Sequence, residues 1–263
     1  NKSGFFNLSI SNNNLKNNFE RFQNNLSKTN PSFSNLSNEE ETKIRFISNY
    51  NTSNLKFSYG GNFQLSDYLN TTQYDYYNIN YNSKIDFIKY GVFVKSSKTF
   101  FDDKLGMSFG VRVDQDNFTE ENNFFENISP RLALSIIISE NNKWKFNLAS
   151  GRYFKIPTYT SLGFKNLNDI FLNKNSKYTR SDHLVGGLEY NWTESSRLTF
   201  EAFYKKYKNY PVSKIDRVSL ANKGADFEVL GNEEILTIGK GKSYGLEFLY
   251  QQKLKNNFYG ILS

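Results

Sequence analysis

The sequence predicts an all-β protein, and within that class an antiparallel transmembrane β-barrel of which this chain forms a part. The first observation is the composition: aromatic residues make up 17% of the 263 residues, and only 4 are proline. Aromatic and β-branched side chains favour strands, whereas the abundant asparagine and glycine favour turns. The second observation is a period of two in hydropathy, and the third is the spacing of the segments that show it.

Alternation is clearest in residues 104–114. Leu105, Met107, Phe109, Val111 and Val113 share one face, while the residues between them are small or charged. Strict alternation of this kind predicts a strand with one apolar face. The same pattern, strong or weak, predicts about eleven strands at 3–10, 43–50, 55–66, 87–98, 104–114, 130–139, 143–152, 182–193, 197–208, 242–252 and 257–263.

The connections between these segments alternate in length. Five long ones are expected at 11–42, 67–86, 115–129, 153–181 and 209–241, and the five between them are short. Long loops at one end and tight turns at the other are typical of outer-membrane barrels, with the long loops extracellular and the short turns periplasmic. A secreted carbohydrate-binding β protein is the less favoured alternative, because a soluble domain has no reason to place its long loops at one end.

Composition also excludes several classes of site. The chain has no cysteine and a single histidine, His183, so we expect no thiolate or multi-histidine metal centre and no cofactor. No catalytic constellation is found on any predicted face, so an enzyme is not expected. The net charge of +7 is spread along the chain, which predicts no nucleic-acid partner and leaves outer-membrane lipid and lipopolysaccharide as anionic partners.

The predicted first and last segments both reach the ends of the chain. An odd number of strands with open edges is not tolerated in lipid. We therefore expect residues 1–263 to be a fragment of a single outer-membrane β-barrel domain, with the final strands lying outside it.

Several separated segments carry a resemblance to a known family. They are 129–134 (SPRLAL), 151–159 (GRYFKIPTY), 180–183 (RSDH) with 187–190 (GLEY), 203–210 (FYKKYKNY) and 239–247 (GKGKSYGLE). In order and spacing they resemble the barrel of TonB-dependent outer-membrane receptors of the kind found in Bacteroidetes. The first 128 residues fit the same barrel by their period alone.

The resemblance implies a barrel of 22 strands, of which this chain supplies about half, enclosing a plug domain. Neither the plug nor the TonB-binding segment is found in this sequence, so both are expected in a missing N-terminal part. The implied function is active uptake of a small ligand, which could be a siderophore, cobalamin, a glycan or a peptide. A passive or structural barrel without a plug remains the alternative.

The resemblance also implies barrel-wall glutamates that face plug arginines. Glu247, in the Gly-x-Glu step that begins at Gly245, matches one such position. At the second position stands Val185, and Glu189 lies on the same face. Alternation adds basic residues to this plug-facing lumen wall, and the whole predicted set is Glu247, Glu189, Arg112 and Arg131.

The alternation further predicts which side chains meet lipid. Phe109, Val111, Leu134 and Leu246 are expected to face outward, and Arg112, Arg131 and Gln251 inward. Ligand contacts are expected where strands meet the long loops, and the predicted ligand-binding residues are Arg152, Tyr153, Tyr159 and Arg180.

Overall fold

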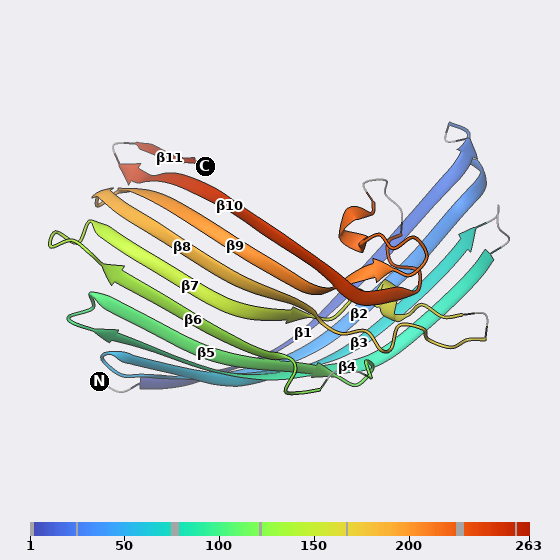
Figure 1. The fold of residues 1–263 in the computed structure, drawn as a ribbon, viewed down its shortest axis with the longest axis horizontal. Helices are drawn as coiled ribbons and strands as arrows, with labels where there is room; N and C mark the ends of the chain where they lie inside the picture. Colours follow the sequence, from blue (N-terminus) through green and yellow to red (C-terminus); the bar gives the residue numbers. More distant parts are fainter. Residues whose placement is uncertain are drawn as a thin grey trace.

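The computed structural model describes residues 3–24, 26–74, 79–120, 123–166, 168–224, 229–255 and 257–263. In these ranges eleven strands form one antiparallel sheet in which spatial order equals sequence order. The sheet curves like part of a barrel wall, with both chain ends near its short-turn end (Figure 1). The prediction of an all-β, antiparallel barrel wall is confirmed.

Each predicted segment overlaps one strand of the sheet. The strands are β1 Ser3–Asn24, β2 Thr29–Asn51, β3 Leu55–Tyr74, β4 Ile79–Phe100, β5 Leu105–Asp116, β6 Ile128–Ile137, β7 Trp144–Lys155, β8 Thr179–Thr193, β9 Ser196–Ser213, β10 Ile235–Lys255 and β11 Phe258–Leu262. In the described parts of the loops before β8 and β10 lie two short helical turns, α1 Tyr159–Leu162 and η2 Leu220–Asn222. No helix in the described ranges is long and apolar enough to cross a membrane.

Two of the expected long loops are mostly strand. Residues 11–42 and 67–86 belong largely to the hairpins β1–β2 and β3–β4, and β1 stays paired with β2 as far as Asn24 opposite Thr29. A strand of 22 residues extends roughly 70 Å, far more than the apolar band of about 25 Å on such barrels. Backbone pairing holds the mostly polar β1–β2 extension, and on the β3–β4 extension apolar packing is confined to the lumen face, at Tyr68 and Ile85. Alternation with an apolar outer face therefore does not reveal either extension.

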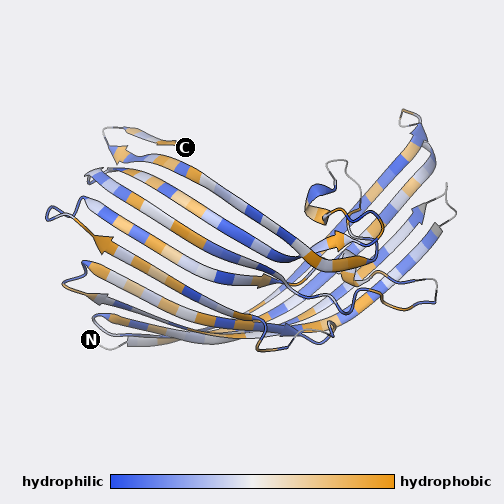
Figure 2. Cartoon of the chain, viewed as in Figure 1, coloured by the Kyte–Doolittle hydropathy of each residue, from blue (hydrophilic) through white to orange (hydrophobic). Residues whose placement is uncertain are grey.

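The two faces of the sheet differ in character. On one face, cross-strand pairing aligns Phe109 with Leu132, and Leu184 with Tyr204. Phe109 is 54% and Leu246 is 71% exposed there, and hydropathy alternates along the strands of this region (Figure 2). We call this the outer face. Alternate residues of a strand point to the same face, a relation that we call parity. By parity the outer face also carries Val111 and Leu134, while Arg112, Arg131 and Gln251 lie on the opposite face.

The opposite face, which we call the lumen face, is covered at its long-loop end. Loop 156–178 packs on β3 and β4, where Tyr159 and Leu162 form the main hydrophobic core with Tyr68, Ile85 and Phe87. Tyr159 lies edge-on to Phe87, with ring centroids 5.1 Å apart. Each large side chain buried this way contributes about 1.5–3 kcal/mol. This packing fixes the position of the loop over the mouth of the lumen.

Candidate functional site

The lumen face has four regions along its strands. A polar latch at the mouth holds loop 156–178, a basic pocket lies below it, and a larger pocket and a row of carboxylates lie towards the short turns. Because alternate residues of a strand point to the same face, each region is assembled from strands that are adjacent in the sheet.

The mouth latch centres on Tyr159, in α1. Its hydroxyl donates to Glu41 of β2 and accepts from Lys89 of β4 and, at 3.3 Å, from Gln64 of β3. Burial alone would raise the pKa of Glu41, but hydrogen bonds from Lys43 and Tyr159 and the charge of Lys89 outweigh it and lower the pKa to about 2. Glu41 is therefore ionised in the latch at neutral pH.

A second tyrosine fixes the far end of the same loop. Tyr178 donates to the buried carboxylate of Asp116, at 2.6 Å, and burial followed by the charge of Asp116 raises the pKa of Tyr178. The hydroxyl thus stays protonated and able to donate. Both ends of loop 156–178 are tied to strands on the lumen face.

Asn173 joins this loop to the next one. Its side-chain amide donates to the carbonyl of Ser161 at 2.6 Å and of Glu233 at 2.9 Å, and its oxygen accepts from the backbone of Ile235 at 2.9 Å. Asn173 is only 1% exposed. Because the amide bridges loops 156–178 and 214–234, the two loops form one cover over the mouth.

The basic pocket lies on the lumen face of β2 and β4–β7, with a volume of about 380 Å³. Arg112 is held by Asp114 and Asn62, each at 2.5 Å. Arg131 lies over the ring of Tyr153 with its guanidinium 4.4 Å from the centroid, a distance typical of a cation–π contact. The basic side chains that line the pocket are Arg45, Lys95, Arg112 and Arg131.

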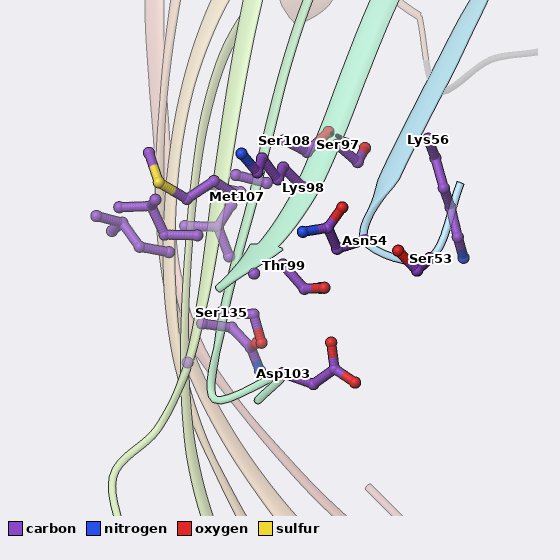
Figure 3. A pocket seen from close by; sticks show the side chains of 18 of the residues that line it. Ser53, Asn54, Lys56, Ser97, Lys98, Thr99, Asp103, Met107, Ser108 and Ser135 are labelled. Atoms are coloured by element: carbon purple, nitrogen blue, oxygen red, sulfur yellow. Dashed lines mark hydrogen bonds between the residues drawn. The ribbon is translucent and has the colours of Figure 1, made fainter. Parts of the chain in front are cut away.

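A larger pocket of about 620 Å³ lies closer to the short turns. Figure 3 shows the small hydroxyl side chains of Ser97, Ser108 and Ser135 together with Lys98 and Asp103 on its wall. Ser97 donates to Ser108 at 3.0 Å. Small apolar side chains, among them Ala133 and Ala149, line the pocket beside these serines.

The carboxylate row lies next to this pocket. Glu247 of β10 is directly opposite Glu201 of β9, and Glu201 is in turn opposite Gly187 of β8. A Cβ at Gly187 would lie 3.0 Å from Cγ of Glu201, so glycine gives this carboxylate its room. Glu189, also on this face, pairs loosely with Arg197 at 3.8 Å. Sequence analysis missed Glu201, because only the strand register shows that it faces Glu247.

The comparison with protein families decides what kind of barrel this is. A family model described as TonB dependent receptor-like, beta-barrel matches residues 1–262. The chain belongs to the TonB-dependent receptor-like β-barrel family. Its place is therefore the outer membrane, as the sequence predicted. The comparison with curated proteins found no match.

Solved structures show the same fold at low sequence identity. The copper transporter OprC superposes with a TM-score of 0.64 at 13% identity, over 95% of this chain and 42% of that one. The outer membrane transporter YddB from Escherichia coli gives 0.56 at 14% identity, over 84% of this chain and 31% of that one. The alcaligin receptor FauA from Bordetella pertussis gives 0.54 at 10% identity, over 97% and 42%. This chain thus spans less than half the length of these structures.

The structure separates the four residues predicted to contact ligand. Tyr153 lies on the lumen face of the receptor barrel, with its ring tilted against that of His183 and the ring centroids 4.6 Å apart. Tyr159 is 7% exposed and belongs to the latch. Arg152 and Arg180 lie on the outer face, where both bind Asp182.

The predicted lumen residues share one face. By register, Arg112, Arg131, Glu189 and Glu247 all lie on the face opposite the apolar row. In the described ranges no group of three or more His, Asp or Glu side chains is placed to hold a metal ion. His183 shares a hydrogen bond of 2.6 Å with Ser181. The lumen face therefore offers basic, aromatic and acidic contacts, and no ready-made metal centre among the described residues.

Proposed function

We propose that this chain forms about half of the barrel wall of a TonB-dependent receptor that takes up a ligand actively across the outer membrane. The ligand classes considered are siderophore, cobalamin, glycan and peptide. Two of the similar structures are a copper transporter and an alcaligin receptor, and this likeness favours a small ligand for the present barrel. The proposal places a plug domain of the same full-length chain inside the lumen, and coupling to the TonB complex in a segment outside these residues.

The observation that carries the proposal is the pair Glu201 and Glu247. Like charges directly opposite each other on adjacent strands destabilise a sheet. In the described ranges neither carboxylate forms an ion pair, and both lie on the lumen face. A plug arginine inserted between them would remove the repulsion and add charge-assisted hydrogen bonds, which are about twice as strong as neutral ones.

The proposed ligand contact is the basic pocket with its aromatic wall. Arg131 and Tyr153 form a flat cationic and aromatic surface below the latched loops. Such a surface suits an anionic ligand with a planar part, because guanidinium binds carboxylate or phosphate bidentately and tyrosine stacks. Arg152 and Arg180 fall outside this contact because they lie on the other face of the sheet.

The experiment uses the full-length receptor in cells. Replacing both carboxylates (Glu201→Gln with Glu247→Gln) should loosen the plug and raise entry of a large antibiotic that intact outer membranes exclude. Glu194→Gln, which removes the same charge from an exposed short turn, is the matched control. Uptake should in addition stop when TonB is deleted.

Two results would contradict the proposal. If the double variant and the control leak equally, the carboxylate pair does not hold a plug. If uptake persists without TonB, the barrel is passive.

A further inference from the structure

The outer face changes character abruptly near the long-loop end. The apolar residues of the outer face form a band that faces lipid, and Leu184 of β8 and Tyr204 of β9 are one cross-strand pair in this apolar band. Two residues further along, Asp182 pairs with Lys206, and Lys206 pairs with Lys242 of β10. Tyr204 and Tyr244 are 44% and 69% exposed just below these charges. An exposed tyrosine row topped by charges marks the boundary between hydrocarbon and headgroups.

This boundary carries a cluster that we call the outer patch. It consists of Arg152 on β7, Arg180 and Asp182 on β8, Lys206 and Lys208 on β9, and Lys242 on β10. Asp182 is the only carboxylate in it. From β7 to β10 the patch extends across three strand spacings, about 14 Å. Five basic side chains against one carboxylate make the patch strongly positive. Its width is comparable to that of a disaccharide headgroup.

Asp182 orients the two arginines. Nε of Arg152 donates to it at 2.8 Å, and Arg180 donates through a terminal nitrogen at 2.6 Å. In the described ranges the terminal nitrogens of Arg152 make no hydrogen bond, and neither Lys206 nor Lys242 forms an ion pair. The patch thus presents oriented, unused donors outward, which is the arrangement that phosphate oxygens require.

An apolar groove adjoins these donors. It has a volume of about 380 Å³, and Phe109, Leu132 and Ser150 line it together with Arg152 and Asp182. Its apolar wall lies on the membrane side of the charged row. A ligand that joins phosphates to hydrocarbon chains would fill the groove and neutralise the patch at the same time.

We propose that the outer patch binds the phosphorylated headgroup of lipopolysaccharide, with an acyl chain in the groove beside Arg152. The long-loop end is the extracellular end of the barrel, and lipopolysaccharide is the anionic glycolipid of that leaflet. The inference rests on the outer-membrane location and not on uptake, because the patch and the lumen lie on opposite faces of the sheet.

The test measures binding of diphosphorylated lipid A to delipidated full-length receptor by native mass spectrometry. The double variant Lys206→Gln with Lys242→Gln should bind about thirty-fold more weakly, since each of the two basic residues contributes on the order of 1 kcal/mol near an anionic surface and every 1.4 kcal/mol is a factor of ten. The control, Lys205→Gln with Lys145→Gln, removes two lysines from the lumen face, one on β9 beside Lys206 and one on β7. It should bind within two-fold of the unchanged receptor.

A comparison of three lipids, all measured on the unchanged receptor, identifies which phosphate-bearing lipid the patch binds. Dephosphorylated lipid A and phosphatidylglycerol should both bind the unchanged receptor at least ten-fold more weakly than diphosphorylated lipid A. Equal binding of either lipid, or equal loss in the double variant and its control, would overturn the proposal. Uptake by the double variant should stay normal, so failure here leaves the proposed transport function standing.

Discussion

Tyr159→Phe should release the cover over the mouth without removing its apolar packing. The change deletes the hydroxyl that donates to Glu41 and accepts from Lys89, but it keeps the ring against Phe87 and Tyr68. A hydrogen bond to a charged group contributes about 1.5–3 kcal/mol. Local opening of the loop should therefore become about 10- to 150-fold more frequent, at a factor of ten for each 1.4 kcal/mol.

Hydrogen exchange of the full-length receptor in detergent measures this opening. The amides of Leu162 and Gly163 bond to carbonyls at Thr158 and Tyr159, so a peptide that spans 158–164 reports directly on the docked turn. Its exchange should accelerate by the factor above. Tyr159→Ala, which also removes the ring, should cost about 3–5 kcal/mol and leave the loop mostly undocked.

Tyr204→Phe is the matched control, because it deletes a tyrosine hydroxyl on the exposed outer face. It should leave exchange in 158–164 unchanged. If Tyr159→Phe also leaves that exchange unchanged, the hydroxyl contacts do not hold the loop, and apolar packing alone accounts for its position.

Three further predictions concern the same face. Glu41 has a pKa of about 2 in the fold against an ordinary value of 4.5, so the latch should keep its full stability above pH 4.5 and lose about 3 kcal/mol as the pH falls towards 2, measurable as faster exchange in 158–164. Asn173→Ala should loosen loops 156–178 and 214–234 together by about 2–3 kcal/mol, and loosening of one loop alone would contradict the bridge. Tyr153→Ala should weaken ligand binding while Arg152→Ala does not, as measured by calorimetry once a ligand is in hand.

Much of the barrel wall could be predicted because lipid imposes a strict rule on strands that cross it. Residues 104–114 alternate because one face must be apolar along the whole span, and the structure places β5 there. The extensions of β1–β4 could not be found this way. Above the membrane neither face of the β1–β2 extension meets lipid, so sequences such as the run from Asn12 to Asn14 carry no periodic signal although their backbones pair.

The faces on which Arg152 and Arg180 lie follow from the alternation of side chains along β7 and β8. Alternation puts Trp144, Phe146 and Leu148 on the apolar face, and the same parity continues to Arg152. Counting from Leu184 likewise puts Arg180 outward. The alternation of side chains therefore predicts the face on which Arg152 and Arg180 lie, which proximity to a long loop does not. Glu201 is a different case, since its partner lies 46 residues away and only pairing of β9 with β10 joins the two.

Parity also explains how one sheet can serve two unlike partners. Neighbours in sequence alternate between them: Lys205 lies over Phe203 on the lumen face, while Lys206 belongs to the outer patch. A one-residue slip of β9 against β8 would exchange these two lysines between the faces. The outward side chains Phe200 and Tyr204 of β9 would turn inward in the same step, and Glu201 would turn towards lipid at a high cost. The lipid requirement that selects the register of the band therefore also positions the lumen residues and the outer patch, so both surfaces depend on the same hydrophobic alternation.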